Sequence, residues 1–185
     1  WHIECSSIIE TYLGETIDIH LGGNDLIFPH HENEIAQSTC SHMGKPLSKY
    51  WIHNGFISMA KEKMSKSAGN IILIDDLLKD YTGESIRLAM ISAHYKQPLE
   101  WSNKILNQAN KNLENLYDIV GDEINFNNVE PPKKFFDALL NDLNTPEALK
   151  ELYELSKNKN AKDQLKSAAN YLGILQLTKK EWMDQ

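Results

Sequence analysis

The stretch from Ile17 to Glu34 reads IDIHLGGNDLIFPHHENE, and it contains the features that decide the fold of the first part of the chain. Residues 17–21 alternate between apolar and polar and end at Gly22-Gly23, which predicts a strand running into a tight loop. Pro29 is tolerated in the first turn of a helix, so a helix is expected from there to about His42. The stretch therefore predicts a strand, a loop and a helix within residues 1–50.

Residues 51–96 are expected to form a small connecting domain. Asn54-Gly55 lies between two apolar runs, residues 51–53 and 56–59, and this dipeptide is the strongest short signal for a β-hairpin. Further on, two short helices are predicted over residues 75–80 and 84–93.

Residues 97–185 show the spacing of amphipathic helices and predict an antiparallel bundle with short loops. Pro131-Pro132 separates its first two helices, and Thr145 followed by Pro146 is a good start for the third. The apolar stripes comprise Leu106, Ala109, Leu113, Leu116 and Val120; Phe135, Phe136, Leu139, Leu140 and Leu143; Leu149, Leu152 and Tyr153; and Leu165, Ala168, Ala169, Leu172 and Leu175.

Composition excludes some classes of protein but does not identify a function. The 185 residues are 41% hydrophobic and 24% charged, with a net charge of −7, and no apolar run approaches the ~20 residues of a membrane span. Two cysteines indicate a reducing cytosol rather than a disulfide scaffold. Because the sequence starts at Trp1 and shows no signal peptide, we expect a fragment or a processed form. The negative charge is only a weak argument against nucleic acid, since a local basic face suffices for binding.

His30 and Glu34 are four residues apart, so on a helix they share one face and can reach one metal ion. Cys5 could add a thiolate from a separate segment, and a set of sulfur, nitrogen and oxygen ligands suits zinc. The alternative is structural, with Cys5 in a core and the histidines lining a helix. A zinc-peptidase helix is excluded, because Ile35 occupies the position of the second histidine.

Two further segments suggest nucleotide chemistry. Gly22 and Gly23 would allow the backbone to approach a nucleotide, and Asp25 could accept hydrogen bonds from ribose hydroxyls, although the same residues are ordinary in turns. The loop Lys63–Ser67 carries two lysines that could follow the charge on a leaving pyrophosphate, although a solvated linker has the same composition.

Several of these segments together resemble one family. Lys63-Met64-Ser65-Lys66-Ser67 matches the KMSKS signature of class I aminoacyl-tRNA synthetases. The opening segment WHIECS, the stretch from Asp18 to Cys40, and residues 144–148 (NTPEA) resemble the cysteine-specific members, the cysteinyl-tRNA synthetases. The resemblance runs from Trp1 to about Tyr153.

The resemblance implies a fold and a domain organisation. Residues 1–50 would be an α/β Rossmann-like remnant, the second half of a class I catalytic domain with the zinc and cysteine site. Residues 51–96 would be the connecting, stem-contact region with the KMSKS loop, and residues 97–185 an all-α bundle on the anticodon side. The HIGH signature would belong to a missing N-terminal half, so this chain alone is expected to be inactive.

The resemblance also implies roles for single residues. Cys5, His30 and Glu34 would be three of the four protein ligands of one zinc ion, with a further N-terminal cysteine as the fourth. Trp1 and His20 would line the amino-acid pocket. Gly22, Gly23 and Asp25 would contact ATP, and Lys66, assisted by Lys63, would stabilise the transition state of adenylate formation. Zinc would distinguish cysteine from serine, because it prefers a thiolate.

The implied partners are tRNA(Cys), L-cysteine and ATP with Mg²⁺, in a cytoplasmic, monomeric protein that has no contact with a membrane. One alternative is a ligase that joins cysteine to an amino sugar in mycothiol synthesis, with the same zinc site and phosphate loop. The segment HENEIAQS and the long helical tail favour the synthetase. The other alternative is a non-catalytic, tRNA-binding fragment, against which the intact set of site residues argues.

Overall fold

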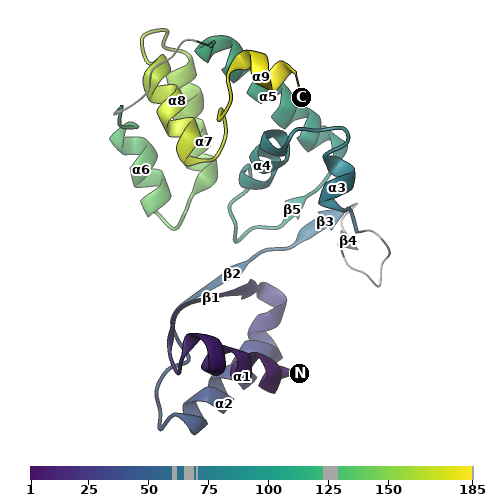
Figure 1. Cartoon of the computed structure of the whole chain (residues 1–185), viewed down its shortest axis with the longest axis vertical. Helices are drawn as coiled ribbons and strands as arrows, with labels where there is room; N and C mark the ends of the chain where they lie inside the picture. The colour runs from purple at the N-terminus through teal and green to yellow at the C-terminus, as the bar shows by residue number, and fades with distance from the viewer. Residues whose placement is uncertain (60–61, 65–68, 70, 123–128, 185) are drawn as a thin grey trace. The chain divides into compact units, whose positions relative to one another are not determined.

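The computed structural model describes residues 1–59, 62–64, 69, 71–122 and 129–184, and its chain divides into two compact units (Figure 1). The first unit is Trp1–Phe56 and the second is Ile57–Gln185. The expected boundaries were at residues 50 and 96. The observed division falls after Phe56, because residue 50 lies inside a strand that pairs with the first unit, and no division falls at residue 96.

The first unit is an α/β arrangement around two parallel strands (Figure 1). Its elements are α1 (His2–Leu13), β1 (Ile17–Gly23), η1 (Asn24–Leu26), the π-helical turn η2 (Ile27–His31), α2 (Glu32–Ser41) and β2 (Ser48–Asn54). β1 pairs with β2 in parallel, from Ile17 opposite Ser48 to Gly23 opposite Asn54. The expected strand, loop and helix are confirmed, and with β2 they form the strand–helix–strand unit that parallel sheets require.

The interior of the first unit is mostly polar. Within residues 1–56, Ile9 and Leu47 are the buried hydrophobic residues. The buried polar residues are Ser6, His30, His31, Glu34, Ser38 and Ser48. Buried polar groups are costly unless they are paired, so this unit depends on specific polar contacts rather than on an apolar core.

The hairpin expected at Asn54-Gly55 is wrong. β2 ends at Asn54 and pairs with β1, whereas β3 (Ile57–Met59) pairs antiparallel with β4 (Glu62–Lys63) and parallel with β5 (Leu99–Glu100). A local turn signal predicts pairing of the strands on its two sides only when they have no other partner. Here β2 pairs with β1, and β3 pairs with β4 and β5, so the chain continues through Gly55 without reversing.

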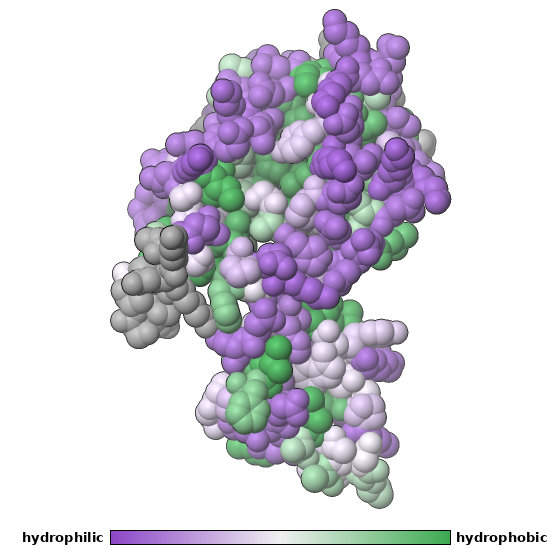
Figure 2. All heavy atoms as spheres, turned by 180° about the vertical axis from the view of Figure 1, so that it is seen from behind, coloured by the Kyte–Doolittle hydropathy of each residue, from purple (hydrophilic) through white to green (hydrophobic). Residues whose placement is uncertain are grey.

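The second unit is largely helical and packs around one apolar core (Figure 1). Its helices are α3 (Ile74–Leu77), α4 (Gly83–Ile91), α5 (Asn103–Val120), α6 (Lys133–Leu140), α7 (Thr145–Ser156), α8 (Lys162–Tyr171) and α9 (Lys179–Met183). The whole stripe expected on α5, from Leu106 to Val120, is buried. Hydrophilic residues predominate over this unit on the face shown in Figure 2. In the part of the chain that the structure describes, no helix is both long and apolar enough to cross a membrane.

Three details of the expected helices need correction. Leu140, the last residue of α6, is exposed. Leu143 is also exposed, because the chain turns after α6 through Asp142 and Leu143 at φ of 57° and 53°, where helical spacing no longer applies. Asn144, not Thr145, caps α7, since its side chain accepts a hydrogen bond from the Glu147 amide. Leu175 is buried as expected but lies beyond the end of α8.

The side chain of Glu84, at the start of α4, joins three segments of the second unit. Its carboxylate accepts hydrogen bonds from the Tyr117 hydroxyl (2.9 Å) and from the amides of Leu175 (3.0 Å) and Gln176 (2.8 Å). Burial, and next the charge of Glu84, raise the pKa of the Tyr117 phenol, so its hydroxyl remains a donor. Leu175 has a φ of 56°, and this junction holds its strained backbone in place.

We predict that Glu84→Gln lowers the free energy of unfolding of the second unit by about 1.5–3 kcal/mol, the range for hydrogen bonds to a charged group. The glutamine amide places an N–H donor at a position where a carboxylate oxygen of Glu84 now accepts a hydrogen bond. Urea unfolding followed by circular dichroism measures the loss. Glu114→Gln, at an exposed position on α5, is the matched control. Equal stability of the two variants would show that the junction contributes nothing.

Candidate functional site

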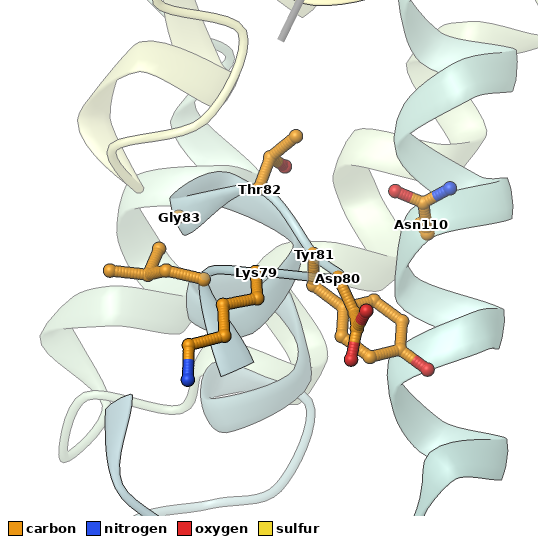
Figure 3. A pocket seen from close by; sticks show the side chains of 7 residues that line it. Lys79, Asp80, Tyr81, Thr82, Gly83 and Asn110 are labelled. Carbon is orange, nitrogen blue, oxygen red and sulfur yellow. The ribbon is translucent and has the colours of Figure 1, made fainter. Parts of the chain in front are cut away.

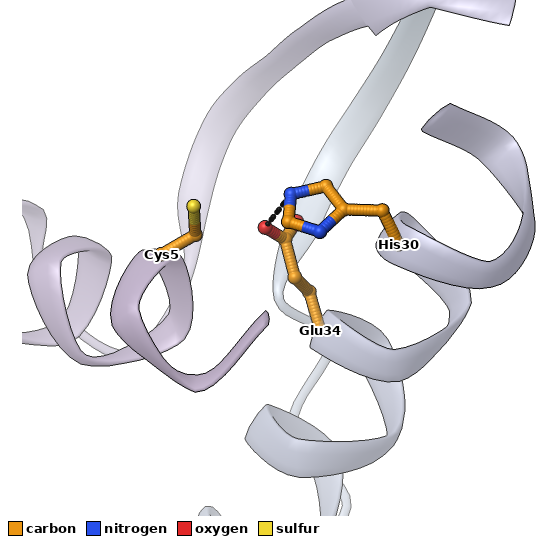
Figure 4. Close-up of side chains that lie close together, drawn as sticks. All are labelled: Cys5, His30 and Glu34. Carbon is orange, nitrogen blue, oxygen red and sulfur yellow. Dashed lines mark ion pairs between the residues drawn. The ribbon is translucent and has the colours of Figure 1, made fainter. Parts of the chain in front are cut away.

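The structure brings together the three expected metal ligands, which come from three different elements of the first unit (Figure 4). Cys5 lies on α1, His30 on the turn η2 and Glu34 in the first turn of α2. One ligand atom from each lies within 4.8 Å of the other two. The three side chains can therefore reach a single ion, as the i, i+4 spacing of His30 and Glu34 predicts.

The carboxylate of Glu34 is at the centre of this cluster, and its side chain is 1% exposed. Oε1 lies 2.7 Å from His30 Nε2, and Oε2 lies 3.4 Å from His20 Nε2. Among the described residues, neither oxygen accepts a hydrogen bond of acceptable geometry. A buried carboxylate without hydrogen bonds needs a positive charge beside it, so its surroundings fit a cation.

The donor set fits zinc in particular. Burial, followed by the nearby charge of Glu34, raises the pKa of the Cys5 thiol. A bound divalent cation reverses this effect, because it stabilises the thiolate and neutralises the carboxylate. One sulfur, one imidazole nitrogen and one carboxylate oxygen are all ordinary zinc ligands.

The orientation of His30 is fixed from the side opposite Glu34. Its Nδ1 lies 2.7 Å from Nδ1 of His2, so one of these nitrogens donates a hydrogen bond to the other. Its ring stacks on Trp1, with centroids 4.0 Å apart and planes 4° from parallel. Such contacts fix the ring plane and leave Nε2 free for a ligand bond. Trp1 itself is 66% exposed.

A second group of side chains continues from Glu34 toward β2. One ligand atom from each of His20, His31 and Glu34 also lies within 4.8 Å of the other two. His20 stacks on Trp51 at 4.5 Å, and His31 Nδ1 lies 2.9 Å from His53 Nε2. Because both groups share Glu34, they form one continuous polar cluster.

Burial disfavours the charged form of both histidines of the second group. Burial, with a smaller effect from the neighbouring histidines, lowers the pKa of His31 to about 4. Burial also lowers the pKa of His20. Sequence reasoning identified His20 but missed His31, His53 and Trp51. The signal for His53 and Trp51 is the register of β2, which places His53 opposite Gly22 and Trp51 opposite His20.

The expected nucleotide turn adjoins this cluster. A Cβ atom at Gly22 would lie 2.5 Å from Cε1 of the buried His31 ring, so close packing requires glycine there. A Cβ atom at Gly23 would lie 2.5 Å from Oδ1 of Asp25, whose side chain is exposed. The turn therefore has a structural reason for glycine at position 22 that the sequence did not indicate.

The expected phosphate loop is only partly placed. The backbone of Lys63 lies in β4, and Lys66 lies outside the described residues. The second unit has a separate cavity of ≈ 240 Å³ at the start of α4, lined by residues 78–83 and Asn110 (Figure 3). Ser85 occupies two of its polar side chains, since its Oγ donates a hydrogen bond to Asn110 Oδ1 and lies 2.9 Å from Thr82 Oγ1. None of the expected site residues lines this cavity.

Comparisons with known proteins show which families the chain resembles. The family described as "tRNA synthetases class I (C) catalytic domain" matches residues 1–111, and the DALR domain family matches residues 134–176. Proteins named cysteine–tRNA ligase are similar along almost the whole chain. The one from Maricaulis maris is 47% identical and the one from Parvibaculum lavamentivorans 49% identical, each over 98% of this chain. The chain spans 42% of the length of each relative.

A solved structure resembles the chain at the level of fold. It is a ternary complex of LeuRS, tRNA and LeuAMS from Agrobacterium radiobacter K84, with a TM-score of 0.62 and 14% identity. The alignment covers 84% of this chain and 25% of the other chain.

We predict that Gly22→Ala destabilises the first unit by about 1–3 kcal/mol, the usual cost of overpacking, and that Gly23→Ala costs less. The buried His31 ring cannot move away from a new methyl group, whereas the exposed Asp25 side chain can. Hydrogen–deuterium exchange of the β1 and β2 amides measures the local opening free energy in each variant. Faster exchange in Gly23→Ala than in Gly22→Ala would contradict the packing described above.

Proposed function

The chain belongs to the class I (C) tRNA synthetases, and from this premise we propose that it acts in the ATP-dependent ligation of L-cysteine to tRNA(Cys) through a cysteinyl-adenylate. In this reaction the carboxylate of cysteine attacks the α-phosphate of ATP and pyrophosphate leaves. A terminal hydroxyl of the tRNA then attacks the carbonyl carbon, and AMP leaves. The names of the relatives support tRNA, rather than an amino sugar, as the acceptor.

The observation that carries the proposal is the buried Glu34 carboxylate, whose oxygens lie among the side chains of Cys5, His30 and His20. Cys5, His30 and Glu34 would hold a zinc ion. When bound, zinc supplies a soft Lewis acid that prefers the thiolate of cysteine to the hydroxyl of serine. His2 and Trp1 keep the His30 ring in place, and this preorganisation lowers the cost of binding.

The neighbouring residues suit the rest of the amino acid and the nucleotide. Trp1 and His20 border the metal ligands and would line the cysteine pocket; the neutral His20 ring would exclude water there without adding a second charge. Gly22, Gly23 and Asp25 would accept ATP at the end of β1, the usual position for ligands beside parallel strands. Lys66, with Lys63, would stabilise the charge that develops on the leaving pyrophosphate.

The second unit would serve the tRNA. Residues 97–185 would lie on the anticodon side, and residues 51–96 would contact the stem. Several helices of this unit carry exposed lysines, including Lys104 and Lys111 on α5, which suit phosphate contacts despite the net negative charge of the chain.

We predict that Cys5→Ala lowers bound zinc in the purified full-length protein from about one ion per chain toward none, because it removes the thiolate ligand. It should also abolish cysteine-dependent exchange of pyrophosphate into ATP. Metal analysis after dialysis and an exchange assay with cysteine or serine are the measurements.

The matched control is Cys40→Ala, which removes the other cysteine of the chain at an exposed position near the end of α2. It should retain both zinc and exchange. Undiminished zinc in Cys5→Ala would refute the metal site, and exchange that fails to distinguish cysteine from serine would refute the proposed substrate.

A further inference from the structure

The helices α1 and α2 contact each other in the first unit, and three polar pairs connect α1 to the segment from η2 to the end of α2. On α1 the partners are residues 2, 6 and 10, which are four apart and therefore share one face. We call these pairs the polar seam: His2 Nδ1 with His30 Nδ1 at 2.7 Å, Ser6 Oγ with Gln37 Oε1 at 2.7 Å, and Glu10 Oε1 with His42 Nε2 at 3.3 Å.

The middle pair of the seam is the one best placed to fix how the two helices are aligned. Ser6 is buried, with 7% of its surface exposed, and its hydroxyl donates to Gln37. Glu10, by contrast, is exposed. The buried apolar residue of α1 is Ile9, and apolar contact is non-directional, so it tolerates sliding and rotation of one helix on the other. A directional hydrogen bond does not, because a shift breaks the 2.7 Å contact of the buried Ser6 hydroxyl with half-buried Gln37 and leaves the hydroxyl only the His2 carbonyl, at 3.3 Å, as an acceptor.

This alignment determines the geometry of the metal ligands. Cys5 directly precedes Ser6, and Glu34 lies one turn before Gln37 on α2. A shift of α1 by one residue moves its side chains about 1.5 Å along the axis and turns them by about 100°. Zinc–ligand distances tolerate only about 0.2 Å, so such a shift would remove Cys5 Sγ from the ion.

We propose that Ser6 and Gln37 are positioning residues for the metal site, and that their hydrogen bond sets the separation of Cys5 from Glu34. The inference rests on the proposed zinc site and assigns to it two residues that do not touch the ion. The pair acts on the site through helix alignment, just as the contact of His2 with His30 acts on it through ring orientation.

The test is the affinity for zinc of Ser6→Ala in the full-length protein, measured by competition with a chromophoric chelator. We expect affinity to fall by about 10–100-fold, the usual effect of losing a residue that orients a ligand. Ser7→Ala is the matched control, because Ser7 is the exposed neighbour on the same helix. The cobalt-substituted protein provides a second readout: the thiolate-to-cobalt absorption should weaken in Ser6→Ala and remain in Ser7→Ala.

Three further variants separate a positioning role from a general loss of structure. Ser6→Thr keeps the hydroxyl and Gln37→Glu keeps an acceptor oxygen, so both should retain the cobalt spectrum. Gln37→Leu should lose it, and this variant carries the test if Ser6→Ala does not fold. Wild-type affinity and spectrum in both Ser6→Ala and Gln37→Leu would overturn the inference and leave the metal site intact. Absence of zinc binding by the wild-type protein would instead overturn the proposed function, and this inference with it.

Discussion

The carboxylate of Glu34 lies out of contact with water, with Cys5, His30 and His20 around it, and its two oxygens accept no hydrogen bond of acceptable geometry from the described residues. A charge in this position must be balanced, or the protein loses several kcal/mol in burying it. Because most buried residues of the first unit are polar, little apolar burial is available there to offset that cost. Binding of a cation would therefore stabilise the unit as well as prepare it for its substrate.

The proposed metal ligands and the proposed nucleotide turn are neighbours because His30 and His31 are adjacent in the sequence. His30 turns toward Glu34, whereas His31 packs against Gly22 and lies within hydrogen-bond distance of His53 on β2. His31, whose side chain packs against Gly22, is thus adjacent in the sequence to His30, a proposed metal ligand. Substitution at Gly22 is expected to affect both regions, and this coupling follows from packing alone.

The sequence predicted most of the elements and the central part of the site. The i, i+4 spacing of His30 and Glu34 depends only on local helical geometry, and the stripe on α5 depends only on helical periodicity, so both could be derived without tertiary information. The hairpin at Asn54-Gly55 failed because the pairing of β2 is decided by β1, more than twenty residues earlier in the chain. His53 and Trp51 could not be assigned for the same reason, since only strand register brings them to His31 and His20. Leu143 keeps the spacing of a helix that ends at Leu140.

The central claim is that the cluster around Glu34 is a metal site that recognises a thiolate. X-ray absorption at the zinc edge, recorded on the full-length protein with and without cysteine, tests it most directly. The account predicts that cysteine adds one sulfur neighbour to zinc at about 2.3 Å, and that serine at the same concentration adds none. A zinc coordination shell that does not change when cysteine binds would contradict the account, because Glu34 and its neighbours would then have no part in selecting the substrate.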